Sequence, residues 1–225
     1  MNETMSISES HLMGRRPGGR KAWSARQQDI LDALEKLFLA EGFQHLTVAD
    51  MVEHLRCSRR TLYSLAPSRE ELVFVVIDRF LTNMGSAAQA KVDACANPAD
   101  AVAAYMGTSI TQLASAHPVF FDDLESYLPT KHLYDRHVHY ALGVLGGLID
   151  EGMQRGMFRH LDAAVIAEIV DAAVERIRRP DVLARAGVSW SQALTNLSEL
   201  LRYGLLHPDP PAGAEEGRVA SRATG

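Results

Sequence analysis

The segment Thr47–Ser68 constrains the fold most, because it predicts two short helices joined by a tight turn. Thr47 can cap the first helix, with Asp50 three residues further on in a variant of the capping box. Ser58 can cap the second helix. The apolar residues of the first helix recur at helical spacing, which gives the helix one face for a core. They are Val48, Met51, Val52 and Leu55.

The second short helix leaves a polar face outside. Leu62 and Leu65 can point back to the core. Arginine can bind guanine through two hydrogen bonds, and hydroxyl groups can bind phosphate. This pattern favours a helix that enters a groove of DNA, with an ordinary solvated helix face as the alternative. The outward residues are Arg59, Arg60, Thr61 and Tyr63.

Residues 23–41 predict a further helix, which completes a three-helix unit. Gly42 can end this helix. Phe43 and Leu46 can anchor the connection to the next helix. Together the three helices can bury a small core. The apolar face of the first helix consists of Ile30, Leu31, Leu34, Leu37 and Phe38.

The charge of the chain is uneven along its length. The 225 residues carry a net charge of −5, which argues against a protein that coats nucleic acid with its whole surface. Residues 11–26, however, contain five Arg and Lys and no Asp or Glu. A basic end on an acidic body can place a DNA surface at one pole. We expect residues 1–22 to form a disordered basic arm that either follows DNA or stays solvated.

Several functional classes lack support in the sequence. Cys57 and Cys95 form neither a metal-like motif nor a disulfide framework, which favours a reduced, intracellular setting. We find no secretory signal and no apolar run of bilayer length, so we expect a cytoplasmic protein without a membrane partner. The usual hydrolase, nucleotide and dinucleotide motifs are absent, so we expect no enzyme activity, no metal and no cofactor. A less favoured alternative is a metal site built from His117, Asp122, Asp123 and Glu125.

The order and spacing of these residues resemble the DNA-binding domain of the TetR (tetracycline-repressor-like) family of transcriptional regulators. The resemblance covers about residues 24–80 and runs from Arg26 through Glu41-Gly42-Phe43, Leu46–Asp50 and Cys57–Tyr63 to Pro67–Leu72. It implies an all-α protein with an N-terminal helix-turn-helix domain and a C-terminal helical bundle for ligand binding and dimerisation. The DNA contacts that it implies are Thr47, Arg59, Arg60, Thr61, Tyr63 and Arg69. Beyond the resemblance, we also count Arg56 and Ser58 in the turn between the two short helices among the candidate DNA-binding residues.

Three positions depart from the family pattern. Arg56 occupies the turn where glycine is usual; if this site needs a positive φ, a residue other than glycine costs on the order of 1 kcal/mol. Leu65-Ala66 replaces the usual aromatic pair after the second short helix. Cys57 replaces a small aliphatic residue, and a buried thiol is usually inert.

The remaining chain predicts a helical bundle. We divide the sequence into an arm at 1–22, a helix-turn-helix domain at 23–70, an effector-binding and dimerisation domain at 71–207, and a disordered tail at 208–225. Three glycines in the helix expected at 130–154 predict that another helix or a ligand lies close against it. They are Gly143, Gly146 and Gly147. The other bundle helices are expected at about 68–95, 98–116, 119–128, 162–179 and 189–206.

The last two helices have apolar residues on more than one side, which is typical of helices buried on more than one side. We therefore expect a homodimer through these helices; the alternative is that both close the core of a monomer. A mostly apolar bundle with scattered polar groups also suits a ligand pocket, although the same residue types form ordinary cores. The candidate ligand residues are Tyr105, Met106, Phe120, Phe121, Tyr127, Tyr134, His137 and Met153.

These observations predict a DNA-binding transcriptional regulator. We expect a homodimeric repressor that a small-molecule effector releases from a palindromic operator in double-stranded DNA. Two alternatives stay open. In one, the bundle binds a protein partner rather than a small molecule. In the other, the chain is an all-helical enzyme with an accidental helix-turn-helix.

Overall fold

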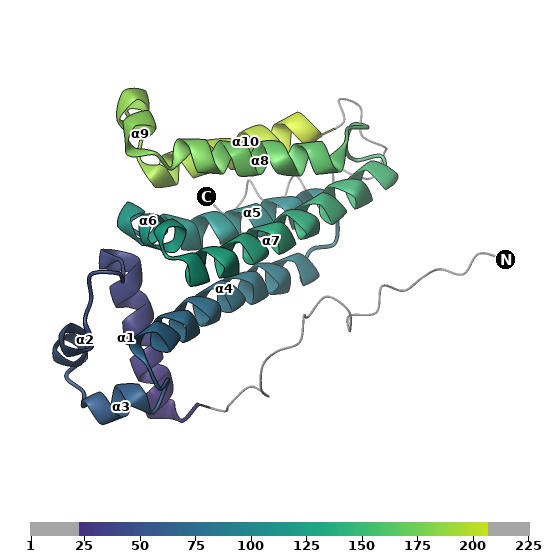
Figure 1. The fold of residues 1–225 in the computed structure, drawn as a ribbon. Helices are drawn as coiled ribbons and strands as arrows, with labels where there is room; N and C mark the ends of the chain where they lie inside the picture. The colour runs from purple at the N-terminus through teal and green to yellow at the C-terminus, as the bar shows by residue number, and fades with distance from the viewer. Residues whose placement is uncertain (1–22, 207–225) are drawn as a thin grey trace, which may run out of the picture.

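The computed structural model describes residues 23–206, and these residues form an all-α structure (Figure 1). The arm expected at 1–22 and the tail expected at 208–225 lie outside the described residues. An isolated bridge between Phe158 and Leu206 is the one β-type pairing within 23–206. The helices are α1 (Ala25–Glu41), α2 (Val48–Leu55), α3 (Arg59–Tyr63), α4 (Arg69–Asp93), α5 (Pro98–Ala114), α6 (Pro118–Ser126), α7 (Leu128–Gln154), α8 (Ala163–Ile177), α9 (Pro180–Ala186) and α10 (Trp190–Leu205).

The N-terminal helices begin where the sequence places their caps. The Thr47 and Asp50 pair forms the predicted capping box of α2. The Ser58 hydroxyl accepts a hydrogen bond from the Thr61 N–H at the start of α3. The Ser68 hydroxyl caps α4 by accepting a hydrogen bond from the N–H of Glu71. A side-chain acceptor at this position satisfies an N–H that has no partner within the helix.

The helix-turn-helix unit and the nearest part of the bundle share one core. α1, α2 and α3 lie together at one end of the molecule, and α4 leads from them into the bundle (Figure 1). The bundle residues Phe120, Phe121 and Leu133 belong to the same buried cluster as the apolar faces of α1–α3. This continuity makes the N-terminal unit part of a larger packed body. Its side chains with almost no exposed surface include Leu31, Leu34, Phe38, Phe43, Met51 and Leu62.

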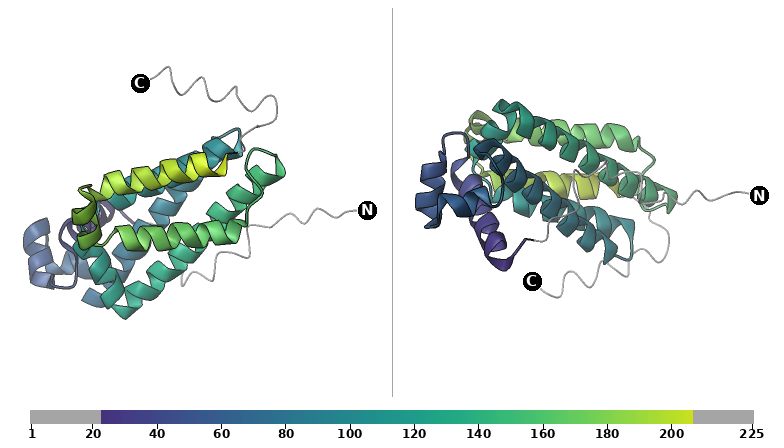
Figure 2. Two further views of the ribbon diagram at one scale, coloured as in Figure 1. Left: turned by 90° about the horizontal axis from the view of Figure 1, so that it is seen from above. Right: turned by 60° about the horizontal axis from the view of Figure 1, so that its bottom comes forward.

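The bundle is arranged in layers. α5 packs against α4 on one side and α10 on the other, and α7 packs against α4, α5 and α8. α8 and α10 form the layer across α5 and α7 from α4 (Figure 1), and the view from above shows them next to each other (Figure 2). A second buried cluster fills the space between these layers, with Ile149, Leu194 and Leu205 at its centre.

Two parts of the predicted bundle are wrong in detail. The helix expected at about 119–128 ends earlier, at Ser126, and Pro129 lies in the first turn of α7, which begins at Leu128. Proline fits there because its missing N–H would have no partner in the first turn of a helix. The short helix α9 was not predicted. It occupies the connection between α8 and α10, and Gly187 ends it with a left-handed backbone at φ 66°.

Within the described chain, the structure places no other helix close against the three glycines of α7 for which a close neighbour was predicted. A Cβ atom added to Gly143, Gly146 or Gly147 would meet nothing within 4 Å in the described part of the chain. At Gly152, by contrast, a Cβ atom would overlap the ring of Phe158, which lies directly against the helix backbone. Phe158 follows the turn after α7 and is buried, so Gly152 is the glycine that packing requires.

Gly152→Ala is therefore expected to lower the free energy of unfolding by about 1–3 kcal/mol, because the added methyl group must displace a buried ring. Urea unfolding followed by circular dichroism measures this change. Gly143→Ala is the matched control. It should stabilise the protein by up to about 1 kcal/mol through helix propensity alone. Equal unfolding midpoints for the two variants would contradict this packing.

Candidate nucleic-acid interface and neighbouring pocket

The turn between α2 and α3, together with α3 itself, presents a basic surface. Arg56, Arg59 and Arg60 are exposed, and the segment from Arg56 to Ser68 contains no Asp or Glu. Tyr63 is 48% exposed, whereas Leu62 is buried in the core. α3 thus turns its apolar residue inward and offers guanidinium and hydroxyl groups outward. This is the chemistry that binds phosphates and base edges.

The three arginines are placed by different parts of the turn. Arg56 ends α2 with a left-handed backbone, φ 47° and ψ 45°. The condition stated for this position is therefore met, and Arg56 bears a conformational cost that glycine would avoid. Arg59 and Arg60 form the first turn of α3, directly after its cap.

The small hydroxyl residues of the predicted site hold this geometry. The Ser58 and Thr61 hydroxyl oxygens lie 2.8 Å apart and share a hydrogen bond. Thr47 is exposed at the start of α2, where the carboxylate of Asp50 accepts hydrogen bonds from its N–H and its hydroxyl, both at 2.7 Å. These bonds hold the pKa of Asp50 below its usual value. The three residues stand at helix starts, so they position α2 and α3.

Arg69 is engaged inside the protein. The resemblance implies a phosphate contact for this residue. In the structure its Nε donates to the Leu46 carbonyl at 2.7 Å, and its Nη2 donates to the Phe43 and Gln44 carbonyls at 2.8 Å each. Its side chain is 25% exposed. Arg69 therefore holds residues 42–47, here called the α1–α2 loop.

Asp123 of α6 holds the same loop. One carboxylate oxygen of Asp123 accepts hydrogen bonds from the Phe43 N–H at 2.5 Å and the Gln44 N–H at 2.9 Å. The Gln44 side-chain amide returns two bonds to α6, to the Asp123 carbonyl and the Ser126 hydroxyl. Gly42 makes this approach possible. Its φ is 79°, and a Cβ atom there would lie 2.5 Å from the carboxylate.

The sequence gives no sign of this connection, because no local pattern pairs residues 80 positions apart. The contact between Asp123 and the loop also explains why the less favoured metal site is wrong. Among the described residues, no group of three or more His, Cys, Asp or Glu side chains is arranged around a metal position. Asp123 is bound to the loop. Glu125 lies 3.3 Å from Lys131, and the His117 Nδ1 accepts from the Val119 N–H.

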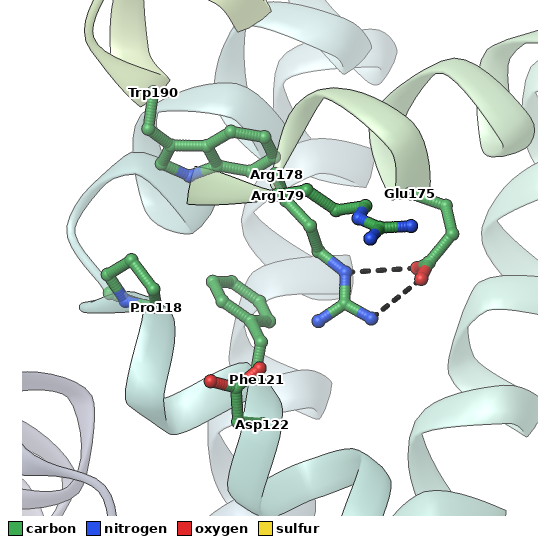
Figure 3. A pocket seen from close by; sticks show the side chains of 8 residues that line it. Pro118, Phe121, Asp122, Glu175, Arg178, Arg179 and Trp190 are labelled. Atoms are coloured by element: carbon green, nitrogen blue, oxygen red, sulfur yellow. Dashed lines mark hydrogen bonds and ion pairs between the residues drawn. The ribbon is translucent and has the colours of Figure 1, made fainter. Parts of the chain in front are cut away.

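A pocket of about 240 Å³ lies beside the same helix. It opens between α6, the end of α8 and the start of α10, and Figure 3 shows its lining side chains. Phe121 and Asp122 of the pocket directly precede Asp123 of the loop contact. One short helix therefore carries both features. The lining residues are Ala116, Pro118, Phe121, Asp122, Glu175, Arg178, Arg179 and Trp190.

The structure does not bring the eight predicted ligand residues together. Phe121 is the one that lines this pocket. Phe120, Tyr127 and Tyr134 belong to the core shared with the helix-turn-helix unit, and Phe120 lies edge-on to Phe43 and Phe80. Tyr105, Met106 and Met153 belong to the second cluster.

The polar members of the set are mostly enclosed. The Tyr105 hydroxyl donates to the Ala141 carbonyl at 3.2 Å, and burial raises the pKa of Tyr105 to about 12. Burial likewise raises the pKa of Tyr134 to about 12 and lowers that of His137 to about 4. All three side chains therefore remain uncharged near neutral pH. Tyr105 is buried, whereas Tyr134 and His137 are half-buried, and the sequence carried no signal that separates a core role from a ligand-binding role.

α8 and α10 leave an apolar face uncovered. Val165 and Ile169 of α8 are 53% and 56% exposed, and Leu200 and Tyr203 of α10 are 72% and 60% exposed. We call these four residues the α8–α10 face. It lies in the layer that Figure 2 shows from above. Within residues 23–206, no helix is both long and apolar enough to cross a membrane.

The family comparison matches the same N-terminal unit. Residues 30–76 match the family model of bacterial regulatory proteins, tetR family. This range contains most of α1, all of α2 and α3, and the first turns of α4. No curated protein matches the chain significantly.

Solved structures share the whole fold at low sequence identity. A transcriptional regulator from Saccharomonospora viridis in complex with choline is 15% identical, with a TM-score of 0.69 over 82% of this chain and 100% of that chain. The TetR-family regulator PfmR from Thermus thermophilus is 22% identical, with a TM-score of 0.56 over 79% and 99%. AibR in complex with isovaleryl coenzyme A and operator DNA is 17% identical, with a TM-score of 0.57 over 80% and 100%.

The exposed basic α3, the match of residues 30–76 and the shared all-helical architecture agree with one another. The N-terminal unit therefore matches the helix-turn-helix DNA-binding domain of the TetR family over residues 30–76, and the chain as a whole shares its fold with solved transcriptional regulators.

Proposed function

We propose that this regulator is a homodimeric repressor that leaves a palindromic operator when a small molecule binds its bundle. The observation that carries this proposal is the double role of α6. Its Asp123 holds the loop before the DNA-facing helices, and its Phe121 and Asp122 line the pocket. A ligand that shifts α6 would therefore change how α2 and α3 are held. Because its target is genomic DNA, we place the regulator in the cytoplasm.

The α8–α10 face supports the dimer. Large exposed apolar patches mark interaction surfaces, and a two-fold axis pairs the same patch on two copies. A dimer of this kind carries two copies of α3. In helix-turn-helix dimers these helices enter major grooves about 34–36 Å apart, which corresponds to one turn of DNA and requires a near-palindromic site.

Release by an effector needs only a modest coupling energy. About 1–3 kcal/mol between the two sites changes DNA affinity by roughly 5- to 150-fold, provided that the effector binds the two states unequally. Relatives of this fold solved with choline or with isovaleryl coenzyme A support a small-molecule ligand for the bundle. The competing proposal of a protein partner for the bundle predicts no thermal stabilisation by any metabolite.

Substitutions on the basic surface test the DNA contacts. Arg60→Ala should weaken operator binding by about 1–3 kcal/mol and relax the base preference at one position of each half-site. Arg56→Ala should weaken binding to all sequences alike and lower the salt slope by about 0.9, since it removes one phosphate charge contact. Tyr63→Phe should weaken binding to all sequences alike and leave the salt slope unchanged.

Fluorescence anisotropy with operator and scrambled duplexes at several salt concentrations measures these effects. Arg185→Ala is the matched control, because Arg185 lies on α9 with 68% of its side chain exposed. Wild-type affinity for all three variants of the basic surface would disprove the assignment of the DNA-facing helix.

Charge on the α8–α10 face tests the dimer. Ile169→Glu and Leu200→Glu should each convert the dimer to a monomer and weaken operator binding by at least about tenfold, because a buried unpaired carboxylate costs several kcal/mol. Analytical ultracentrifugation gives the mass. Phe74→Glu on α4, where the ring is 37% exposed, should leave the mass unchanged. If both variants remain dimers, this face is excluded as the dimer interface.

Asp123→Ala tests the coupling through α6. The variant should fold, lose about 1–3 kcal/mol of stability with two loop N–H groups left unpaired, and bind the operator less tightly. An effector that releases the wild-type protein should then have a smaller effect. Asp135→Ala on α7 removes an exposed ion pair with Lys131 and serves as the control in the same titrations. Unchanged DNA affinity and effector response would exclude Asp123 from the coupling.

A further inference from the structure

The pocket beside α6 has an aromatic side that is rigidly held. The Phe121 and Trp190 rings lie edge-to-face, with centroids 6.3 Å apart and an interplanar angle of 66°. The Trp190 indole N–H donates to the Leu113 carbonyl at 3.2 Å, which fixes the orientation of its ring. Pro118 extends this wall (Figure 3). The apolar or aromatic part of a ligand can therefore pack here with little further loss of side-chain entropy.

A second wall carries hydrogen-bond donors. Arg178 donates from Nε and Nη2 to the Glu175 carboxylate, at 3.0 Å and 2.8 Å, and its guanidinium carbon stands 6.0 Å from the Phe121 ring centroid. These contacts leave Arg178 only 16% exposed. Its Nη1 has no hydrogen-bond acceptor among residues 23–206 and is turned away from Glu175 (Figure 3).

The remaining charged groups lie at the rim. Arg179 is 61% exposed, and its ion pair is with Asp181 at 3.4 Å, outside the pocket. Asp122 is exposed on α6, and its carboxylate has neither an ion pair nor a hydrogen bond within the described chain. Arg178 is compensated by Glu175 and by Glu125, whose Oε1 lies 3.7 Å from Arg178 Nη2. The groups left for a ligand are therefore the Nη1 donors of Arg178, the guanidinium group of Arg179 and the carboxylate of Asp122.

We propose that this pocket binds a small zwitterion whose carboxylate and ammonium groups flank an apolar body. The carboxylate accepts from Arg178 Nη1 with Arg179 beside it. The ammonium group pairs with Asp122, and the body packs on Phe121 and Trp190. The volume of about 240 Å³ lies below the roughly 300–1,000 Å³ of pockets for drug-sized ligands, which limits the occupant to the size of an amino acid.

This proposal rests on the proposed function in one respect, namely that the pocket is the effector site. Its chemistry is tested without DNA. Isothermal titration calorimetry on the full chain compares L-phenylalanine with phenethylamine, which lacks the carboxylate, and with 3-phenylpropionate, which lacks the ammonium group. L-Leucine carries the same carboxylate and ammonium groups on an aliphatic side chain. We expect one of the two amino acids to bind. The two truncated compounds should bind at least about tenfold more weakly than L-phenylalanine, or not at all.

Two variants locate the site. Arg178→Lys keeps the positive charge beside Glu175 but removes the Nη1 donors. It should weaken amino-acid binding by roughly tenfold and leave phenethylamine binding unchanged. Asp122→Asn should weaken amino-acid binding to a similar degree and leave 3-phenylpropionate binding unchanged. Asp122 is exposed and unpaired within residues 23–206, so this variant keeps the fold, which its melting temperature checks.

The outcomes separate the two proposals. No heat from either amino acid, or equal binding of all three phenyl compounds, overturns the zwitterion site even if the protein binds its operator specifically. Binding that depends on Arg178 and Asp122 confirms the site. If such binding leaves operator affinity unchanged, the site stands and the proposed effector response fails.

Discussion

The position of α2 and α3 depends on how the α1–α2 loop is held. Asp123 accepts hydrogen bonds from the N–H groups of Phe43 and Gln44, and Arg69 donates to the carbonyl groups of the same two residues. Enclosed backbone groups must be paired, and here two charged side chains from α6 and α4 pair them. Charge-assisted bonds are the stronger kind, so the start of α2 is tied to both helices, and α3 follows α2.

The surrounding core also packs the α1–α2 loop tightly against α6 and α4. Phe120 of α6 packs edge-on against Phe43 of the loop and Phe80 of α4. On the other side of α4, Arg79 pairs with Asp32 and Glu35 of α1, and burial raises the pKa of Glu35. Close-packed cores do not deform continuously. A displacement of α6 must therefore move the loop with it or open the core, which is the behaviour that a switch between two arrangements requires.

The difference between local and distant contacts explains which features the sequence predicted. The caps at Thr47, Ser58 and Ser68 involve partners three residues away, so they follow from local spacing. Arg69 shows the opposite case. Its place in the family pattern indicates a phosphate contact, while its three carbonyl partners lie 23–26 residues away and leave no trace in a local pattern. The eight predicted ligand residues do not line one pocket, and the sequence could not indicate this because buried Tyr, Phe and Met serve a core and a pocket equally well.

The pocket itself depends on the helix that no pattern predicted. Pro180 begins α9 directly after α8, where a proline cannot extend the preceding helix, and Gly187 closes α9 in a left-handed conformation. This reversal brings Arg178 at the end of α8 and Trp190 at the start of α10 to the same side of α6. Arg178 also carries its positive charge at the negative end of the α8 dipole. The chain reversal thus places a guanidinium group and an indole ring against the helix that holds the α1–α2 loop, so the proposed ligand site and the support of α2 and α3 meet on α6.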